Sequence, residues 1–170
     1  LVVENCSLLE KPMPYNLWRA PTDNDRNVRH HWQACGYDRT VSHAYETQVG
    51  WDGDSVVIHS VLSISAVYLQ RILDIEAFWT VDGAGRVACR FEVKKNPHTP
   101  FLPRFGLRLF LPARMEQVTY LGRGPVESYR DKRWASTVGL YTSHVRDMHE
   151  DYIKPQENGS HCSCSFMHVT

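Results

Sequence analysis

Three short stretches concentrate the charged and polar side chains that could bind or act on a polar ligand. The first, NLWRAPTDND, covers residues 16–25 and places Arg19 ahead of an acidic cluster, with Pro21 between them. A loop with this density of charge could bind a polar ligand. In the alternative that we favour, Arg19 pairs with a carboxylate and Asp23 or Asn24 caps a helix. Partly buried charges must be paired, and Asp and Asn are common helix caps.

The second stretch, YLGRGPVESYRDKR, covers residues 120–133 and combines four basic residues with two acids and two glycines. Gly122 and Gly124 allow a positive φ or a close approach of the backbone to another surface. The stretch lacks the GxxxxGK[ST] pattern of a phosphate-binding loop. Its charges could contact a sugar or a protein partner, or they could pair with each other in a connection between two strands.

The third stretch, YIKPQENGSHCSCSF, covers residues 152–166. Glu157 could act as a general base or bind sugar hydroxyls, and Asn158 precedes a glycine in a predicted turn. Glu127, Asp131 and Glu157 could be assembled into a pair of catalytic carboxylates, but the sequence does not give their separation, which sets the mechanism. The chain has no GxSxG pattern for a nucleophilic serine. We assign no residue a catalytic role.

The cysteines of the third stretch raise the possibility of a metal site. In a strand, Cys162 and Cys164 would share one face with Phe166 and His168. A structural zinc site usually has four ligands and a CxxC-type pattern, whereas free cysteine packs as a small apolar side chain. We therefore expect a buried row of core residues and no metal site.

The dominant pattern along the chain is the alternation of apolar and polar residues with a period of two, which indicates half-buried strands. The alternation is clear over residues 55–64, 86–94 and 105–111. Residues 82–85, with the sequence DGAG, predict a hairpin turn before the second of these strands.

One short helix is expected over residues 26–35, capped by the acidic cluster at 23–25 and ended by Gly36. No other segment has convincing helical periodicity. Many strands with one short helix indicate an all-β fold, a large antiparallel β-sandwich. We expect a single domain over residues 1–170, because the sequence contains no linker or internal repeat.

Composition excludes several classes of function. Lys plus Arg and Asp plus Glu both number 19, so the formal net charge is zero. Proteins that bind nucleic acid or membrane surfaces carry a basic excess, so we expect neither partner. No apolar run approaches the roughly 18 residues that cross a bilayer. Five cysteines at irregular spacing argue against a disulfide framework and favour the cytoplasm, with the periplasm as the alternative. Both ends of the chain look cut, so we expect a fragment of a longer polypeptide.

The three stretches, in this order and at these separations, resemble the patterns RAP-x-DND, GxGP-x-E-x-Y-x-D and P-x-ENG. These patterns are typical of the small-chain domain of bacterial β-galactosidases of glycoside hydrolase family 2. The resemblance spans most of the chain. It implies a large antiparallel supersandwich of the galactose mutarotase type, in agreement with the fold class expected from the alternation.

The resemblance also implies a parent enzyme that hydrolyses terminal β-galactosides with retention of configuration. Its two catalytic glutamates belong to a TIM barrel that precedes the small-chain domain. Magnesium and sodium are bound mainly by other domains, so it implies no cofactor in this chain. The implied partners are a carbohydrate substrate, the preceding barrel of the same polypeptide and further copies of the enzyme in a homo-oligomer.

We expect the polar groups of the three stretches to converge at one end of the sandwich and to bind substrate or form an interface. The candidate residues are Arg19, Asp23, Asn24, Asp25, Arg123, Glu127, Tyr129, Arg133, Glu157 and Asn158. A free-standing sugar-binding or mutarotase-like epimerase domain is the alternative, and it requires a His and a Glu in one pocket. A structural interaction module would instead expose Trp18, Trp32 or Trp134.

Overall fold

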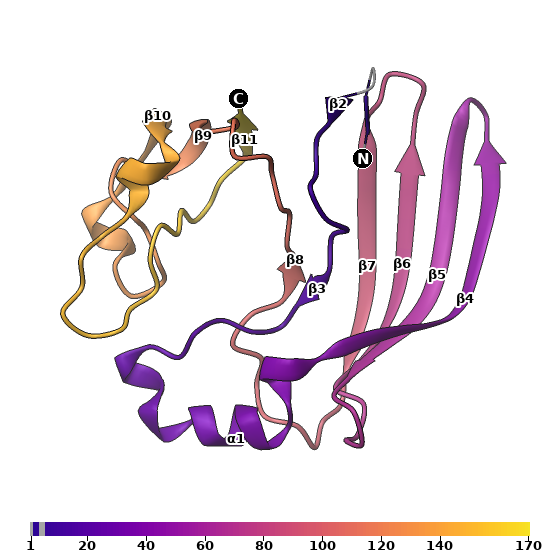
Figure 1. Ribbon diagram of the computed structural model, residues 1–170, viewed down its shortest axis with the longest axis horizontal. Coiled ribbons are helices and arrows are strands. Elements are labelled where there is room, and N and C mark those ends of the chain that lie inside the picture. The colour runs from indigo at the N-terminus through magenta and orange to yellow at the C-terminus, as the bar shows by residue number, and fades with distance from the viewer. Residues whose placement is uncertain (1, 4–5) are drawn as a thin grey trace.

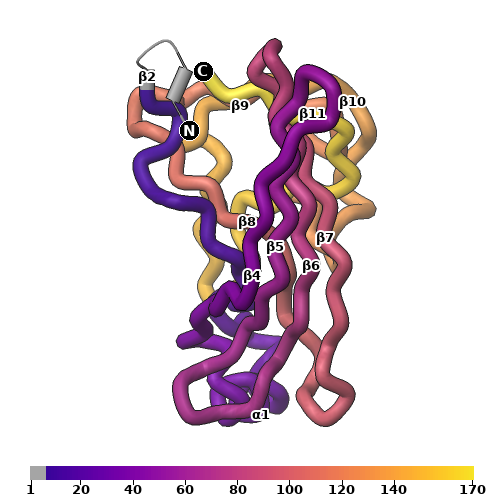
Figure 2. The backbone as a smooth tube through the Cα atoms, turned by 90° about the vertical axis from the view of Figure 1, so that its right-hand side faces the viewer, coloured from indigo at the N-terminus to yellow at the C-terminus, as the bar shows by residue number. Residues whose placement is uncertain are grey.

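The larger of the two main sheets has four antiparallel strands in the order β4-β5-β6-β7 (Figure 1). The computed structural model describes residues 2–3 and 6–170. Figure 2 shows the four strands side by side along the length of the molecule, with α1 near one end. Their bounds are β4 (Val41–Asp52), β5 (Ser55–Ser65), β6 (Leu73–Val81) and β7 (Val87–Lys95).

The second main sheet has three antiparallel strands in the order β10-β9-β11, and two pairs of very short strands accompany it. The three strands are β9 (Gln117–Gly124), β10 (Thr137–His144) and β11 (Phe166–Val169). The short pairs are β1 (Val2–Val3) with β2 (Cys6–Ser7), and β3 (Tyr15–Asn16) with β8 (Gly106–Leu107). In Figure 1 the β3–β8 pair lies between the two main sheets. The arrangement confirms the predicted all-β sandwich.

The helical segments are short and lie outside the sheets. They are η1 (Asp23–Asn27), α1 (Arg29–Ala34), η2 (Tyr37–Arg39), η3 (Arg133–Ala135) and η4 (Val145–Met148). The single α-helix was predicted, and the left-handed Gly36 follows its end as expected, with φ of 72°. No helix within the described ranges is long and apolar enough to span a bilayer.

The predicted helix cap was wrong. Thr22, and not the acidic cluster, precedes the first helical turn, and its backbone N–H and its hydroxyl both donate to Asp25 Oδ2, at 2.7 and 2.9 Å. A carboxylate at the third helical position can accept from the cap residue, so Asp25 closes the turn from inside it.

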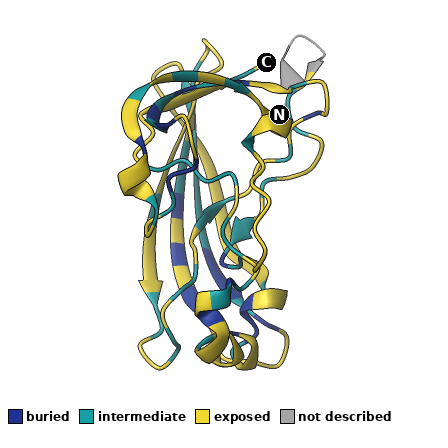
Figure 3. Ribbon diagram, turned by 90° about the vertical axis from the view of Figure 1, so that its left-hand side faces the viewer, coloured by how far each residue is buried: buried dark blue, intermediate teal, exposed yellow. Residues whose placement is uncertain are grey.

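The main core lies where one end of the four-stranded sheet meets α1, and Figure 3 shows the buried positions gathered there. Two buried aromatic residues also satisfy their polar atoms. Trp32 Nε1 donates to the carbonyl of Phe101 at 3.0 Å, and the hydroxyl of Tyr37 donates to the carbonyl of Pro100 at 2.7 Å. The core members are Leu17, Trp32, Tyr37, Leu62, Ile64, Ile72, Leu73, Ile75 and Ala77.

The alternating pattern predicted two strands correctly and a third one incorrectly. Residues 55–64 and 86–94 form β5 and β7, and residues 82–85 form the expected turn between β6 and β7. The expected strand over 105–111 was wrong, because β8 pairs with only two residues of β3. Beyond that pair, single backbone hydrogen bonds join Arg108 to Pro14 and Glu10 to Phe110, but no further strand pairing is present in the described part of the chain. Leu109 is exposed.

The expected buried row from Cys162 to His168 was also wrong. Strand β11 begins only at Phe166, and both Cys164 and Phe166 are exposed. Ser163 adopts a positive φ of 56°, which an extended strand does not accommodate. The alternation of side chains between two faces is therefore interrupted between the two cysteines.

Two glycines with positive φ give a matched test of how tightly the end of α1 packs. A Cβ atom on Gly36 would lie 2.4 Å from Cβ of Ala66, whereas no described atom lies within 4 Å of a Cβ on Gly53. Both substitutions by Ala strain the backbone, but only Gly36→Ala forces neighbouring atoms apart. We expect Gly36→Ala to lower the free energy of unfolding by about 1–3 kcal/mol more than Gly53→Ala, measured in urea. Equal losses would contradict this packing.

Candidate functional site

The first charged stretch is organised around an ion pair between Arg19 and Asp25. Both terminal nitrogens of the guanidinium donate to the carboxylate, and the Nη2–Oδ1 distance is 3.0 Å. The two side chains are only 9% and 12% exposed. Desolvation raises the pKa of Asp25, but hydrogen bonds from Arg19 and Thr22 together outweigh it, so that pKa lies below its usual value. The pair is therefore ionised, and the favoured alternative for Arg19 is confirmed.

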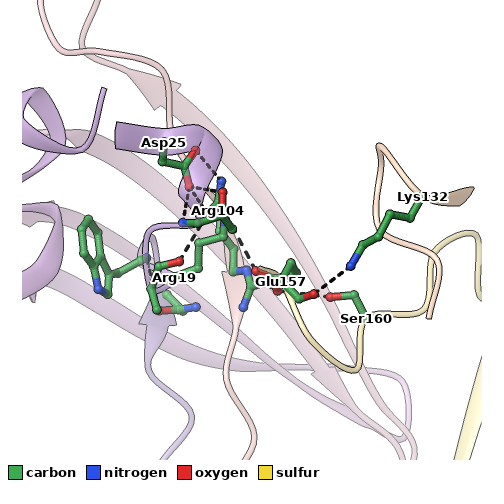
Figure 4. Close-up of polar contacts among 10 residues, drawn as sticks. Arg19, Asp25, Arg104, Lys132, Glu157 and Ser160 are labelled. Atoms are coloured by element: carbon green, nitrogen blue, oxygen red, sulfur yellow. Dashed lines mark hydrogen bonds and ion pairs between the residues drawn. The ribbon is translucent and has the colours of Figure 1, made fainter. Parts of the chain in front are cut away.

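Glu157 of the third stretch lies beside two arginines, Arg19 and Arg104 (Figure 4). Its Oε1 atom accepts from Arg104 Nη2 and, at 3.1 Å, from the hydroxyl of Ser160. Its Oε2 atom lies 4.0 Å from Arg19 Nε, which is beyond hydrogen-bonding distance. Arg19 Nε is buried and has no hydrogen-bond partner among the described residues.

The second stretch contacts the Arg19 guanidinium through Tyr129. The Cζ atom of Arg19 lies 5.9 Å from the centroid of the Tyr129 ring and 5.6 Å from the Trp32 ring. A guanidinium within about 6 Å of an aromatic face is attracted by the negative charge of that face. The three stretches therefore meet around one buried cation.

Glu127 forms a second centre of hydrogen bonds. It accepts from Lys132 Nζ, from the Tyr152 hydroxyl and, at 3.0 Å, from the backbone N–H of Gly159. Lys132 Nζ also donates to the carbonyl of Glu157 at 3.2 Å, which joins the second stretch to the third. Desolvation raises the pKa of Glu127, but these hydrogen bonds outweigh it and hold the pKa below its usual value. Glu127 is thus an ionised, fully paired carboxylate.

Five of the ten predicted site residues come together, and we call them, with their partners, the ion-pair cluster. Its members are Arg19, Asp25, Glu127, Tyr129 and Glu157 from the prediction, with Arg104, Lys132, Tyr152 and Ser160 as additional partners. Sequence reasoning missed Arg104, because it lies outside the three charged stretches and just before the predicted strand at residues 105–111. Lys132 lies in the second stretch and Tyr152 in the third, but the sequence does not show that both side chains are close to Glu127.

The other predicted site residues have separate contacts. Arg123 Nη1 donates to the carbonyl of Ser136 at 3.0 Å, so its side chain supports the turn after η3. Asp23 lies 3.7 Å from Lys154, and the Asn158 amide exchanges hydrogen bonds with the backbone of Glu150. Asn24 is exposed.

Arg133 also lies apart from the cluster. Its guanidinium is 5.5 Å from the ring of Trp134, which is 85% exposed. An interaction module was expected to expose Trp18, Trp32 or Trp134. Trp32 is fully buried and Trp18 is half-buried, so Trp134 is the highly exposed member of the three. The functional role of all ten residues stays a prediction.

A pocket of about 640 Å³ opens beside the cluster. Arg19, Arg104 and Arg108 line it together with Glu157, and Trp18 and Phe105 contribute aromatic surface. A smaller pocket of about 390 Å³ lies along residues 149–156 and Asn158. Among the described residues no group of three or more His, Cys, Asp or Glu could hold a metal ion.

The chain is therefore an all-β domain whose candidate site is the ion-pair cluster. Its largely buried carboxylates are paired with basic side chains. The beta galactosidase small chain family matches residues 1–170, and the chain belongs to that family. It is 37% identical to a beta-galactosidase of Actinobacillus pleuropneumoniae over 161 residues, 95% of this chain and 16% of the relative. It is 34% identical to a Staphylococcus xylosus beta-galactosidase over 155 residues, 91% of this chain and 16% of the relative. The chain thus spans about a sixth of these curated relatives.

We expect Arg19→Lys to destabilise the fold although it keeps the charge. Lysine cannot reproduce the two parallel hydrogen bonds to Asp25 or the stacking of the guanidinium on the aromatic rings. The free energy of unfolding should fall by about 1–3 kcal/mol, because buried partners lose hydrogen bonds. Arg71→Lys is the matched control, since Arg71 pairs with Asp74 on the surface. A loss no larger than in this control would contradict the proposed strength of the buried pair.

Glu127→Gln should change how stability depends on pH. A carboxyl whose pKa is lowered by folding stabilises the protein above its unfolded pKa of about 4.3, and this contribution is lost as the pH falls through the folded pKa. The variant should be less stable at pH 7 by about 1–3 kcal/mol. Its unfolding curves from pH 7 to pH 3 should converge with those of the unmodified protein in acid. Glu92→Gln, at an exposed ion pair, is the control, and a constant difference at all pH values would argue against the lowered pKa.

Proposed function

We propose that this chain is an accessory domain of a longer β-galactosidase that hydrolyses terminal β-D-galactosides with retention of configuration. The observation that carries the proposal is the family match over the whole chain, combined with its small share, 16%, of a relative named beta-galactosidase. Retaining hydrolysis uses two carboxyl groups about 5–5.5 Å apart, one as acid and base and one as nucleophile. We place both outside this chain.

The state of the buried carboxylates supports a non-catalytic role. A general acid of a glycosidase needs a pKa raised toward neutrality so that it can hold a proton. The pKa of Glu127 and that of Asp25 are shifted the opposite way by their cationic partners. Glu157 accepts from Arg104 and Ser160, and Asp131 is exposed. The carboxylates of Glu127 and Asp25 therefore stabilise their loops and are not poised for proton transfer.

In this proposal the domain shapes the enzyme around its active site. The ion-pair cluster would hold the three loops in fixed positions, so that they pack against the preceding TIM barrel and border the carbohydrate. The enzyme would assemble as a homo-oligomer, and its magnesium and sodium ions would be bound by other domains. A cytoplasmic location agrees with the four described cysteine side chains, which are free thiols; that of Cys6 lies outside the described part.

A free-standing sugar-binding or epimerase domain is the second candidate, and the pocket of about 640 Å³ is the observation that favours it. A mutarotase-like epimerase also needs a His and a Glu at one substrate position. Within the described residues, no histidine lines this pocket. His59 lies 3.5 Å from Glu76, but on the four-stranded sheet and away from the pocket. This arrangement supports the accessory role over the epimerase.

The test is the hydrolysis of a chromogenic β-galactoside by the product of the complete gene and by residues 1–170 alone. We expect the complete product to be active and residues 1–170 to be inactive, because the catalytic carboxyl groups would lie elsewhere. Turnover by residues 1–170 would overturn the accessory role and direct attention to Glu127, Asp131 and Glu157. An inactive complete product would overturn the galactosidase assignment and leave the family membership intact.

A further inference from the structure

The pocket beside the ion-pair cluster contains more positive than negative charge. Three guanidinium groups line it, and two of them are neutralised, since Arg19 pairs with Asp25 and Arg104 pairs with Glu157. Arg108 is exposed, and it forms no ion pair with any carboxylate in residues 2–3 and 6–170. Its guanidinium lies 5.0 Å from the centroid of the Phe110 ring, so the positive charge of one residue that lines the pocket has no counter-charge within the described part of the chain.

The buried Arg19 side chain gives a second, independent indication. It is 9% exposed, and the N–H at its Nε atom has no acceptor within the described part of the chain. The nearest carboxylate oxygen, on Glu157, is 4.0 Å away, because the other oxygen of that carboxylate is held by Arg104. A buried N–H without an acceptor is unfavourable. A carboxylate from a ligand that bound Arg104 would release Glu157 to move toward Arg19.

The shape and the other lining groups define what kind of molecule would carry this carboxylate. A volume of about 640 Å³ accommodates a sugar ring. Trp18 and Phe105 supply apolar surface, and the side-chain amides of Asn16 and Gln156 supply hydrogen-bond donors and acceptors. An arginine fork matches the two oxygens of a carboxylate better than it matches a neutral hydroxyl.

We propose that this pocket is a binding site for one carboxylate group, held by Arg108 and Arg104. The group would come from a sugar acid, in which a carboxylate is attached to a hydroxylated ring, or from an acidic side chain of another part of the same polypeptide. The site is additional to the accessory role, and it is argued from the charges and lining of the pocket and from the unpartnered N–H of Arg19.

The first arm of the test measures binding to the complete gene product by calorimetry. The probes are D-galacturonate, D-galactose and acetate, which separate the contributions of the carboxylate and the ring. Arg108→Gln removes the free charge, and Arg130→Gln removes an exposed arginine outside the pocket. For a sugar-acid site we expect galacturonate binding that weakens about tenfold or more in Arg108→Gln and is unchanged in Arg130→Gln, since a lost charged hydrogen bond is worth at least tenfold in affinity.

The second arm is used if galacturonate does not bind, or if its binding is the same in Arg108→Gln as in the unmodified protein. Urea unfolding of the same complete product then tests for a carboxylate within the polypeptide, with Arg108→Lys as the variant that keeps the charge. A midpoint lowered in Arg108→Gln but retained in Arg108→Lys and Arg130→Gln identifies an acidic side chain in the pocket. If Arg108→Gln has no effect, or if Arg108→Lys is equally destabilised, the proposed site is overturned. Hydrolysis of β-galactosides by the unmodified protein reports separately on the accessory role.

Discussion

A single buried cation, the guanidinium of Arg19, is the constraint on which the arrangement of the three loops depends. Removing a charge from water is strongly unfavourable unless the charge is paired and hydrogen-bonded. Arg19 meets this requirement only where Asp25 is brought beside it by the first helical turn. Its two aromatic neighbours come from α1 and from the loop after β9. The position of this one side chain therefore couples segments that are far apart in the sequence.

Glu127 extends the same principle to the far side of the cluster. Its carboxylate is satisfied by a lysine from its own loop and by a tyrosine and a backbone N–H from the loop before β11. Position 122, near the end of β9, requires glycine because the segment before β11 approaches it closely. A Cβ atom on Gly122 would lie 2.6 Å from Cys164 Sγ. Gly122 and Glu127 of the second stretch thus serve one purpose, which is to hold two long connections against each other.

Local patterns in the sequence predicted local structure well. The strands β5 and β7 and the hairpin turn at residues 82–85 are set by residues that are adjacent in the sequence, so the sequence pattern is enough to predict them. The wrong helix cap was a local error, because Thr22 and not the acidic cluster precedes the first helical turn. The two wrong strand predictions depended on partners far along the chain or on a single dihedral angle. Within residues 2–3 and 6–170, the run at 105–111 pairs as a strand only at Gly106 and Leu107. The positive φ of Ser163 interrupts the strand that the cysteines would have occupied.

For the candidate site, residue type predicted that charges would be paired, but it could not predict which ones. Arg104 lies 53 residues before Glu157, so only the tertiary fold brings the two side chains together. The carboxylates of Glu127 and Asp25 have little freedom to take up protons, because their lowered pKa values reflect the same hydrogen bonds that position them. The chemistry of this domain therefore depends on shape and fixed charge. A rigid loop cluster with one uncompensated arginine can orient a neighbouring group or an anionic ligand, while bond cleavage requires carboxyl groups with a different environment.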